Sequence, residues 1–135
     1  MTEFIFGGYI AEVDEAVTSA WYAKSDGWDC SCGHCRNFLE LARRNELPAI
    51  VTEHLQKLKI PPEKATYVCE IFEDEDGLYY QFSYRLAGRF LNGRQEKEDS
   101  IFCGHEPYPY GAPGFPEPHF DLEFWMKLPW ILEED

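Results

Sequence analysis

The pattern of apolar and polar positions predicts a chain built mainly of β-strands. Over residues 78–91, aromatic and aliphatic side chains alternate with polar ones, which is the period-two pattern of a strand with one buried face. Residues 120–128 show the same alternation more strictly. Shorter runs of aromatic and β-branched residues predict further strands. These runs cover residues 4–13 (with a bulge at Gly7-Gly8), 17–23, 66–72 and 101–103.

Two consecutive stretches have the spacing of amphipathic helices instead. The first covers residues 32–44, where apolar side chains such as Phe38 and Leu41 recur at helical intervals. The second covers residues 48–58, and Pro48 suits its first turn because a proline there loses no helical hydrogen bond. Its apolar face is formed by Val51, Leu55 and Leu58.

The order of these elements predicts the fold class. Asp76-Gly77 favours a hairpin between the strands on either side of it, and a second hairpin is expected between strands 4–13 and 17–23. Strands separated by two adjacent helices are typical of an α+β fold. We therefore expect one globular domain over residues 1–135, with a mainly antiparallel sheet and both helices packed on one of its faces.

Composition narrows the classes of partner. The chain has 25 acidic and 12 basic residues, a formal net charge of −13, so phosphate backbones and anionic membranes would be repelled. We expect neither nucleic acid nor membrane as a partner, whereas a basic protein remains compatible with this charge. No stretch reads as a signal peptide or a spanning helix, which predicts a cytoplasmic protein.

One stretch is hard to explain by packing alone. Cys30, Cys32 and Cys35 fall within six residues, and clustered thiols in a reducing compartment indicate metal or redox chemistry. Zinc takes four cysteine or histidine ligands, so the cluster can supply three. Cys103 and His105, in a second Cys-Gly-His sequence, are the candidates for the fourth ligand.

Two other interpretations of the cluster remain open. Cys32-Gly33-His34-Cys35 resembles the C-G-H-C sequence of disulfide isomerases in the thioredoxin superfamily, which implies a Cys32 nucleophile and a Cys35 resolving thiol. That resemblance covers four residues, and a loop precedes them where the superfamily has a buried strand. Alternatively, the cysteines are reduced, unliganded core residues at the start of a helix.

A wider resemblance covers most of the chain from Cys30 onward. Cys30-x-Cys32-x-x-Cys35-Arg36-Asn37-Phe38 resembles the C-x-C-x-x-C-[RK]-N-F signature of a family of small uncharacterised bacterial proteins. Later segments also resemble that family, although Lys59 stands where the family has glycine. Because the family has no assigned activity, it implies no catalytic roles. The later segments are Pro48 to Pro61, the aromatic strand Tyr79 to Arg89, Leu122-Glu123-Phe124 and Pro129-Trp130.

The leading functional hypothesis is a small, acidic, non-enzymatic domain. Its cysteine cluster is structural or holds zinc, and its proline-rich loop, with Tyr108, Tyr110 and Phe115, binds a partner protein or a small ligand. The first alternative is a thiol-disulfide oxidoreductase that uses Cys32 and Cys35. The second is an immunity-type acidic protein that neutralises a basic partner, which predicts salt-sensitive binding.

Overall fold

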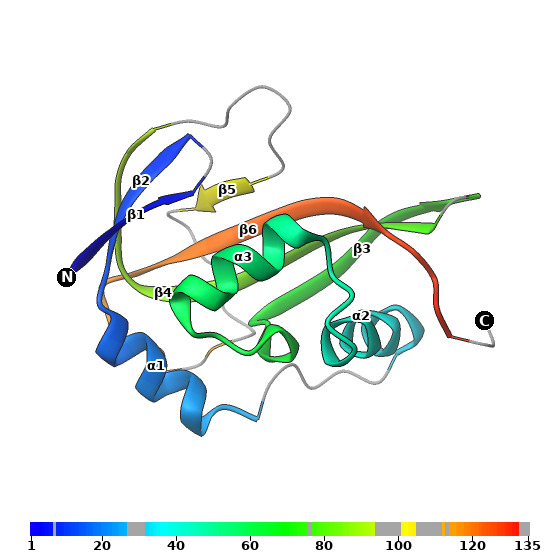
Figure 1. The fold of residues 1–135 in the computed structure, drawn as a ribbon, viewed down its shortest axis with the longest axis horizontal. Helices are drawn as coiled ribbons and strands as arrows, with labels where there is room; N and C mark the ends of the chain where they lie inside the picture. The colour runs from blue at the N-terminus through cyan, green and yellow to red at the C-terminus, as the bar shows by residue number, and fades with distance from the viewer. Residues whose placement is uncertain are drawn as a thin grey trace.

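A computed structural model describes residues 1–6, 8–26, 32–75, 77–93, 101–104, 112 and 114–132. Strands and helices follow one another around a single sheet (Figure 1). In chain order, the elements are β1 (Thr2–Phe6), β2 (Tyr9–Val13), α1 (Glu15–Lys24), α2 (Gly33–Arg43), α3 (Ala49–Leu58), the 3-10 turn η1 (Pro62–Lys64), β3 (Tyr67–Asp74), β4 (Gly77–Gly93), β5 (Ile101–Gly104) and β6 (His119–Leu128).

The sheet is organised around β4, which is 17 residues long. All pairings are antiparallel, with strand order β1-β2-β4-β6-β5, and β3 also pairs with β4. The strand β6 pairs with β4 continuously from Leu78 to Ala87. On the opposite edge, β3 pairs with the first part of β4 up to Ser83, and β2 takes over from Gly88. The strands β3 and β2 therefore pair one after the other with the same edge of β4.

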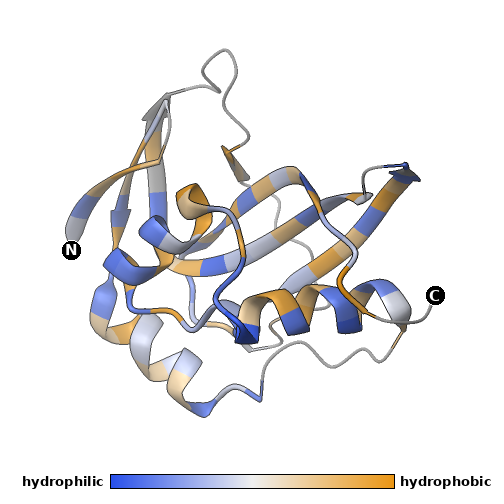
Figure 2. Cartoon of the chain, turned by 45° about the vertical axis from the view of Figure 1, so that its right-hand side comes forward, coloured by the Kyte–Doolittle hydropathy of each residue, from blue (hydrophilic) through white to orange (hydrophobic). Residues whose placement is uncertain are grey.

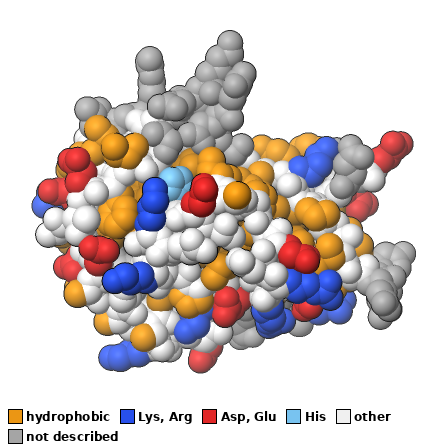
Figure 3. All heavy atoms as spheres, in the orientation of Figure 1, with side chains coloured by type: hydrophobic (Ala, Val, Ile, Leu, Met, Phe, Trp, Pro, Cys, Tyr) orange, Lys and Arg blue, Asp and Glu red, His pale blue; other side chains and the backbone are white. Residues whose placement is uncertain are grey.

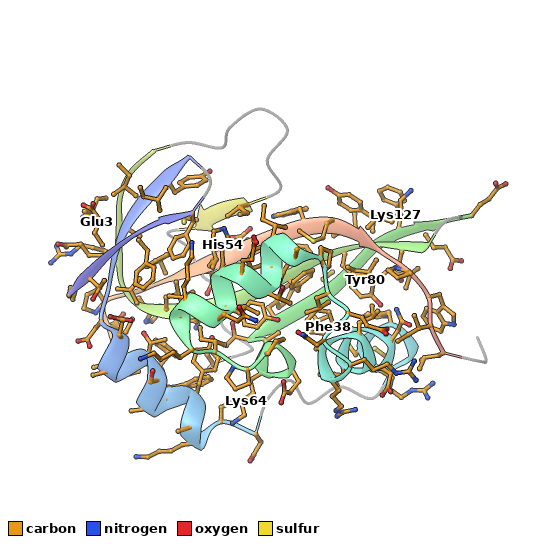
Figure 4. The ribbon with its side chains drawn as sticks, in the orientation of Figure 1. Glu3, Phe38, His54, Lys64, Tyr80 and Lys127 are labelled. Carbon is orange, nitrogen blue, oxygen red and sulfur yellow. The ribbon has the colours of Figure 1, made fainter. Side chains whose placement is uncertain are left out.

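The core lies between the sheet and the helices α2 and α3. Aromatic residues of β4 and β6 face each other across the pairing, and the rings of Phe82 and Phe124 stack 5.5 Å apart. The ring of Phe38 on α2 contacts that of Phe82, and the ring of His54 on α3 contacts that of Phe124. Figure 4 labels Phe38 and His54 on these two helices. Both helices thus cover the same face, and the hydropathy of β4 and β6 alternates along each strand (Figure 2). The predicted α+β class and antiparallel sheet are confirmed.

The two predicted helices match α2 and α3 to within about one residue at each end. The helix α3 starts after Pro48 and buries the predicted stripe of Val51, Leu55 and Leu58. It ends at Lys59, whose backbone is left-handed with φ of 61°. In this conformation glycine would cost less than lysine.

The prediction of a strand at residues 17–23 is wrong, because this segment belongs to the helix α1. Asp14 caps the helix: its carboxylate accepts a hydrogen bond of 3.1 Å from the backbone N–H of Val17. Thr18 and Tyr22, four residues apart, form the buried face. The Tyr22 hydroxyl donates to the Arg85 carbonyl at 2.8 Å, and the Thr18 hydroxyl accepts from the Ala87 N–H at 3.0 Å. These bonds occupy the edge of β4 between β3 and β2.

The predicted hairpin between residues 4–13 and 17–23 is therefore also wrong. The first of these segments is itself a hairpin, in which Phe6 pairs with Tyr9 across a two-residue connection. A Gly-Gly pair at this place favours a tight two-residue turn over a bulge in one continuous strand.

The second face of the sheet carries a buried polar network. Arg85 of β4 and Asp121 of β6 face each other, with Nε and Oδ1 2.9 Å apart, and both side chains are at most 5% exposed. Thr66 donates to the Ser83 carbonyl and accepts from the Arg85 N–H. Burial also raises the pKa of Glu123, which accepts a hydrogen bond from the Trp125 indole at 3.1 Å. The buried charges of Arg85 and Asp121 are thus compensated by their mutual pairing.

Candidate metal centre

Three potential metal ligands meet at the first turn of α2. Cys32 is the N-cap, with extended backbone, and its carbonyl accepts the N–H of Arg36 at 2.9 Å. Cys32 is exposed, whereas Cys35, three residues later on the same side of the helix, is buried. The thiol sulfurs of these two residues and a ring nitrogen of His34 all lie within 4.8 Å of one another. This group can therefore hold a metal ion.

Cys32 and His34 are close enough to become ligands of one ion. Cys32 Sγ lies 3.6 Å from Nδ1 and 3.5 Å from Nε2 of His34. Tetrahedral zinc with bonds of about 2.3 Å to sulfur and about 2.0 Å to nitrogen separates the two ligand atoms by about 3.6 Å. Because the sulfur is almost equally far from both ring nitrogens, it does not lie in line with the lone pair of either one. The His34 ring therefore has to rotate, without rearrangement of the helix backbone, before it can share an ion with Cys32. The same separation also suits a thiol–imidazole hydrogen bond.

The strand β4 fixes the position of this turn. The Tyr80 hydroxyl donates to the His34 carbonyl at 2.6 Å, and Phe38 packs against the ring of Tyr80. Figure 4 shows Phe38 and Tyr80 on α2 and β4, where the two elements meet. Burial raises the pKa of Tyr80 to about 12, and the nearby charges of Cys35, Glu70 and Cys32 add to that rise. The hydroxyl therefore stays protonated and keeps donating at neutral pH.

Asn37 ties the C-terminal segment to the same turn. Its side chain is fully buried; the amide N–H₂ donates to the Pro129 carbonyl at 3.0 Å, and Oδ1 accepts from the Ile131 N–H at 2.8 Å. The N–H₂ group also reaches the Tyr80 hydroxyl at 3.4 Å. Packing thus explains the two residues that follow Cys35 and Arg36: Asn37 binds the C-terminal segment, and Phe38 fills the core.

We expect Asn37→Ala to lower the free energy of unfolding by about 2–4 kcal/mol, because it leaves the Pro129 carbonyl and the Ile131 N–H without their partner. Urea denaturation of the two proteins measures the difference. Gln56→Ala is a suitable control, since the Gln56 amide is exposed on α3. Equal losses for both variants would contradict this role of Asn37.

A pocket of about 360 Å³ lies beside the ligand group. His34 forms part of its wall, so the candidate ligand group and the pocket share a side chain. Two carboxylates of β3 and the ring of Trp130 contribute to the rest of the wall. The lining residues are His34, Glu70, Glu73, Leu78 and Trp130.

The structure brings together only some of the residues that the sequence suggested. Cys32 and Cys35 belong to the ligand group, whereas Cys103 lies in β5 opposite Leu122 and is not a member of it. Leu122 is four residues along β6 from the partner of Tyr80, or about 13 Å at the rise of a strand. Burial raises the pKa of the Cys103 thiol to about 12, which makes it an unreactive core residue.

The structure supports no binding role for the remaining predicted site residues. Cys30, His105, Tyr108 and Tyr110 lie outside the described residues. Phe115 is described and is 5% exposed, with its ring 4.9 Å from that of Trp21, so little of its surface is left for a ligand.

Sequence reasoning did not select His34 as a ligand or Trp130 as part of a pocket. The position of His34, two residues after Cys32 in the first helical turn, was the available indication. No feature of the sequence indicated the pocket, because its wall comes from four separate segments of the chain.

Comparison with known protein families, curated proteins and solved structures finds no match. Within the described ranges, no helix is long and apolar enough to cross a membrane. On the face seen in Figure 3, acidic and basic side chains are interspersed, so the net negative charge does not form one continuous patch there. A basic protein partner stays a prediction.

Proposed function

We propose that this chain is a small non-enzymatic domain in which zinc orders the start of α2. Cys32, His34 and Cys35 supply three ligands, and Cys30, two residues before Cys32, supplies the fourth. The observation that carries the proposal is the grouping of the Cys32 and Cys35 sulfurs with a ring nitrogen of His34, all within 4.8 Å of one another, so that a rotation of the His34 ring is enough for the three to meet one ion. Four protein ligands would close the coordination shell, as in structural zinc sites.

The surroundings support a structural role. Cys35 is buried, and the turn is anchored through Tyr80 to the sheet and through Asn37 to the C-terminal segment. A metal ion bound here would link the loop before α2 to these same anchors. It would thereby also fix the His34 wall of the neighbouring pocket, where a ligand or partner would bind.

One observation favours thiol-disulfide exchange as a second candidate function. Cys32 is exposed at the N-terminus of α2 and contacts His34, whereas Cys35 is buried three residues later. In such an arrangement the Cys32 thiolate attacks a substrate disulfide, and Cys35 then displaces the substrate thiol. The substrate gains two electrons, and a Cys32–Cys35 disulfide forms.

Elemental mass spectrometry of untagged protein, purified without chelator, separates the two candidates. The zinc proposal predicts about one zinc per chain, and thiols of the cluster that react only after chelation. Cys32→Ser should lose most of the metal, whereas the control Cys69→Ser, on β3, should keep it. A metal-free protein with a rapidly reacting Cys32 and a reversible Cys32–Cys35 disulfide would instead establish the oxidoreductase.

A further inference from the structure

We propose that the pocket lined by His34, Glu70, Glu73, Leu78 and Trp130 binds a small organic cation, such as a quaternary or primary ammonium group on a short apolar body. Its volume of about 360 Å³ lies within the range of small-molecule sites. This inference goes beyond the metal centre, because the binding it describes uses His34 only as a wall and needs no metal ion.

A β-bulge directs both carboxylates to this pocket. Glu70 pairs with Tyr80 and Glu73 with Leu78, while the register shifts between Glu70 and Phe72. Residues three apart in a regular strand point to opposite faces. The extra residue at the bulge restores the same side for Glu70 and Glu73, the side on which Tyr80 contacts α2.

The pocket is electrostatically suited to a positive charge. Two carboxylates line it, and no lysine or arginine is among its described lining residues. Glu70 also acts on the Tyr80 hydroxyl, where its negative charge helps to raise the pKa. A bound cation would be attracted by both glutamates, whereas an anion would be repelled by them.

Trp130 and Leu78 supply the apolar part of the site. The backbone on either side of Trp130 is held by Asn37, through the Pro129 carbonyl and the Ile131 N–H. The Trp130 ring also lies close to Gly33, where a Cβ atom would come within 3.5 Å of it. The ring is therefore positioned before a ligand arrives, and an aromatic face of this kind attracts cations.

An organic cation fits these walls better than a bare metal ion. Among the described residues, the metal-ligand group consists of Cys32, His34 and Cys35, and neither Glu70 nor Glu73 joins it. In the part of the chain that the structure describes, the two carboxylates therefore belong to no group of three or more potential metal ligands. A ligand that spans both glutamates and covers Trp130 and Leu78 needs an apolar body of its own.

Choline and its uncharged isostere 3,3-dimethyl-1-butanol test this proposal, because they have nearly the same shape and differ in charge. Isothermal titration calorimetry at low ionic strength should show choline binding about tenfold more tightly than the isostere, a ratio within the range of cation–π and carboxylate contributions. Glu70→Gln and Trp130→Phe should each weaken choline binding about threefold or more.

Glu53→Gln is the matched control. Glu53 is exposed on α3, so this substitution removes one negative charge, as Glu70→Gln does, but outside the pocket. Its choline affinity should equal that of the unchanged protein. Equal affinity for choline and the isostere, no binding of choline, or equal weakening by Glu53→Gln and Glu70→Gln would each overturn the proposal. Cys32→Ser separates the two sites, because it should lose metal while retaining the preference for choline over the isostere, which depends on the glutamates and Trp130.

Discussion

Asp121→Ala is expected to lower the free energy of unfolding by about 3–5 kcal/mol. The Asp121 carboxylate is 1% exposed and accepts hydrogen bonds from Arg85 Nε at 2.9 Å and Nη2 at 3.4 Å. Without it, the buried Arg85 guanidinium would lose the carboxylate that these two bonds join it to, and its charge would be less well compensated. Urea denaturation, with both curves fitted for slope and midpoint, measures the loss.

A double substitution separates two contributions to this loss of unfolding free energy: the loss of the carboxylate that pairs with Arg85, and the loss of side-chain packing. In Arg85→Met/Asp121→Leu both charges are removed and the apolar volume is largely kept, so much of the stability should return. Glu12→Ala is the surface control: Glu12 and Arg89 form an exposed pair at 4.0 Å, worth about 0–1 kcal/mol. A double variant no more stable than Asp121→Ala would show that the ion pair is not the source of the effect.

Gly88→Ala should destabilise the chain by about 3 kcal/mol or more, through a steric clash and backbone strain together. Gly88 has φ of +133°, and a Cβ atom there would lie 2.0 Å from the Glu12 carbonyl oxygen. At this residue the edge of β4 begins to pair with β2, and the Gly88 N–H donates to the Pro118 carbonyl at 2.8 Å. The variant would have to separate β2 from β4.

Gly114→Ala is a control with positive φ but without the steric clash. Gly114 also has positive φ, at +76°, but a Cβ atom there would meet nothing within 4 Å. We expect this control to lose about 1–2 kcal/mol, the cost of placing alanine in a left-handed conformation. Thermal unfolding followed by circular dichroism compares the two variants. Similar losses at both positions would refute the close approach of β2 to Gly88.

Much of the sheet was predictable because its strands carry their own pattern. Along β6, Phe120, Leu122 and Phe124 alternate with acidic residues, and period two allows only one face for each set. The helices α2 and α3 were equally clear, since each has its own apolar stripe. In these elements local pattern and tertiary packing agree.

The errors arose where local preference and tertiary context disagree. The run from Val17 to Ala23 contains β-branched and aromatic residues, yet it is helical because Asp14 caps it and two of its hydroxyls bond to β4. The cap was visible in the sequence as an Asp followed by Glu15 in the first turn. The bonds to β4 were not, since they join residues more than 60 positions apart.

The candidate site was only partly predictable for the same reason. Spacing alone placed a candidate metal centre at Cys30, Cys32 and Cys35, and the last two have neighbouring side chains on one helical turn. The fourth ligand was predicted to be Cys103 or His105. The pairing of β5 with β6 places the Cys103 thiol in a different part of the core, and His105 lies outside the described residues. The pocket depends on a bulge, a helix terminus and the chain end, and no local pattern encodes that combination.

X-ray absorption spectroscopy at the zinc edge tests the central claim, the metal centre at the start of α2, most directly. We predict a coordination shell of three sulfur atoms at about 2.3 Å and one nitrogen atom at about 2.0 Å, from Cys30, Cys32, Cys35 and His34. The His34→Ala variant should lose the nitrogen scattering. A shell made of oxygen and nitrogen alone, or one that persists unchanged in Cys32→Ser, would contradict the account.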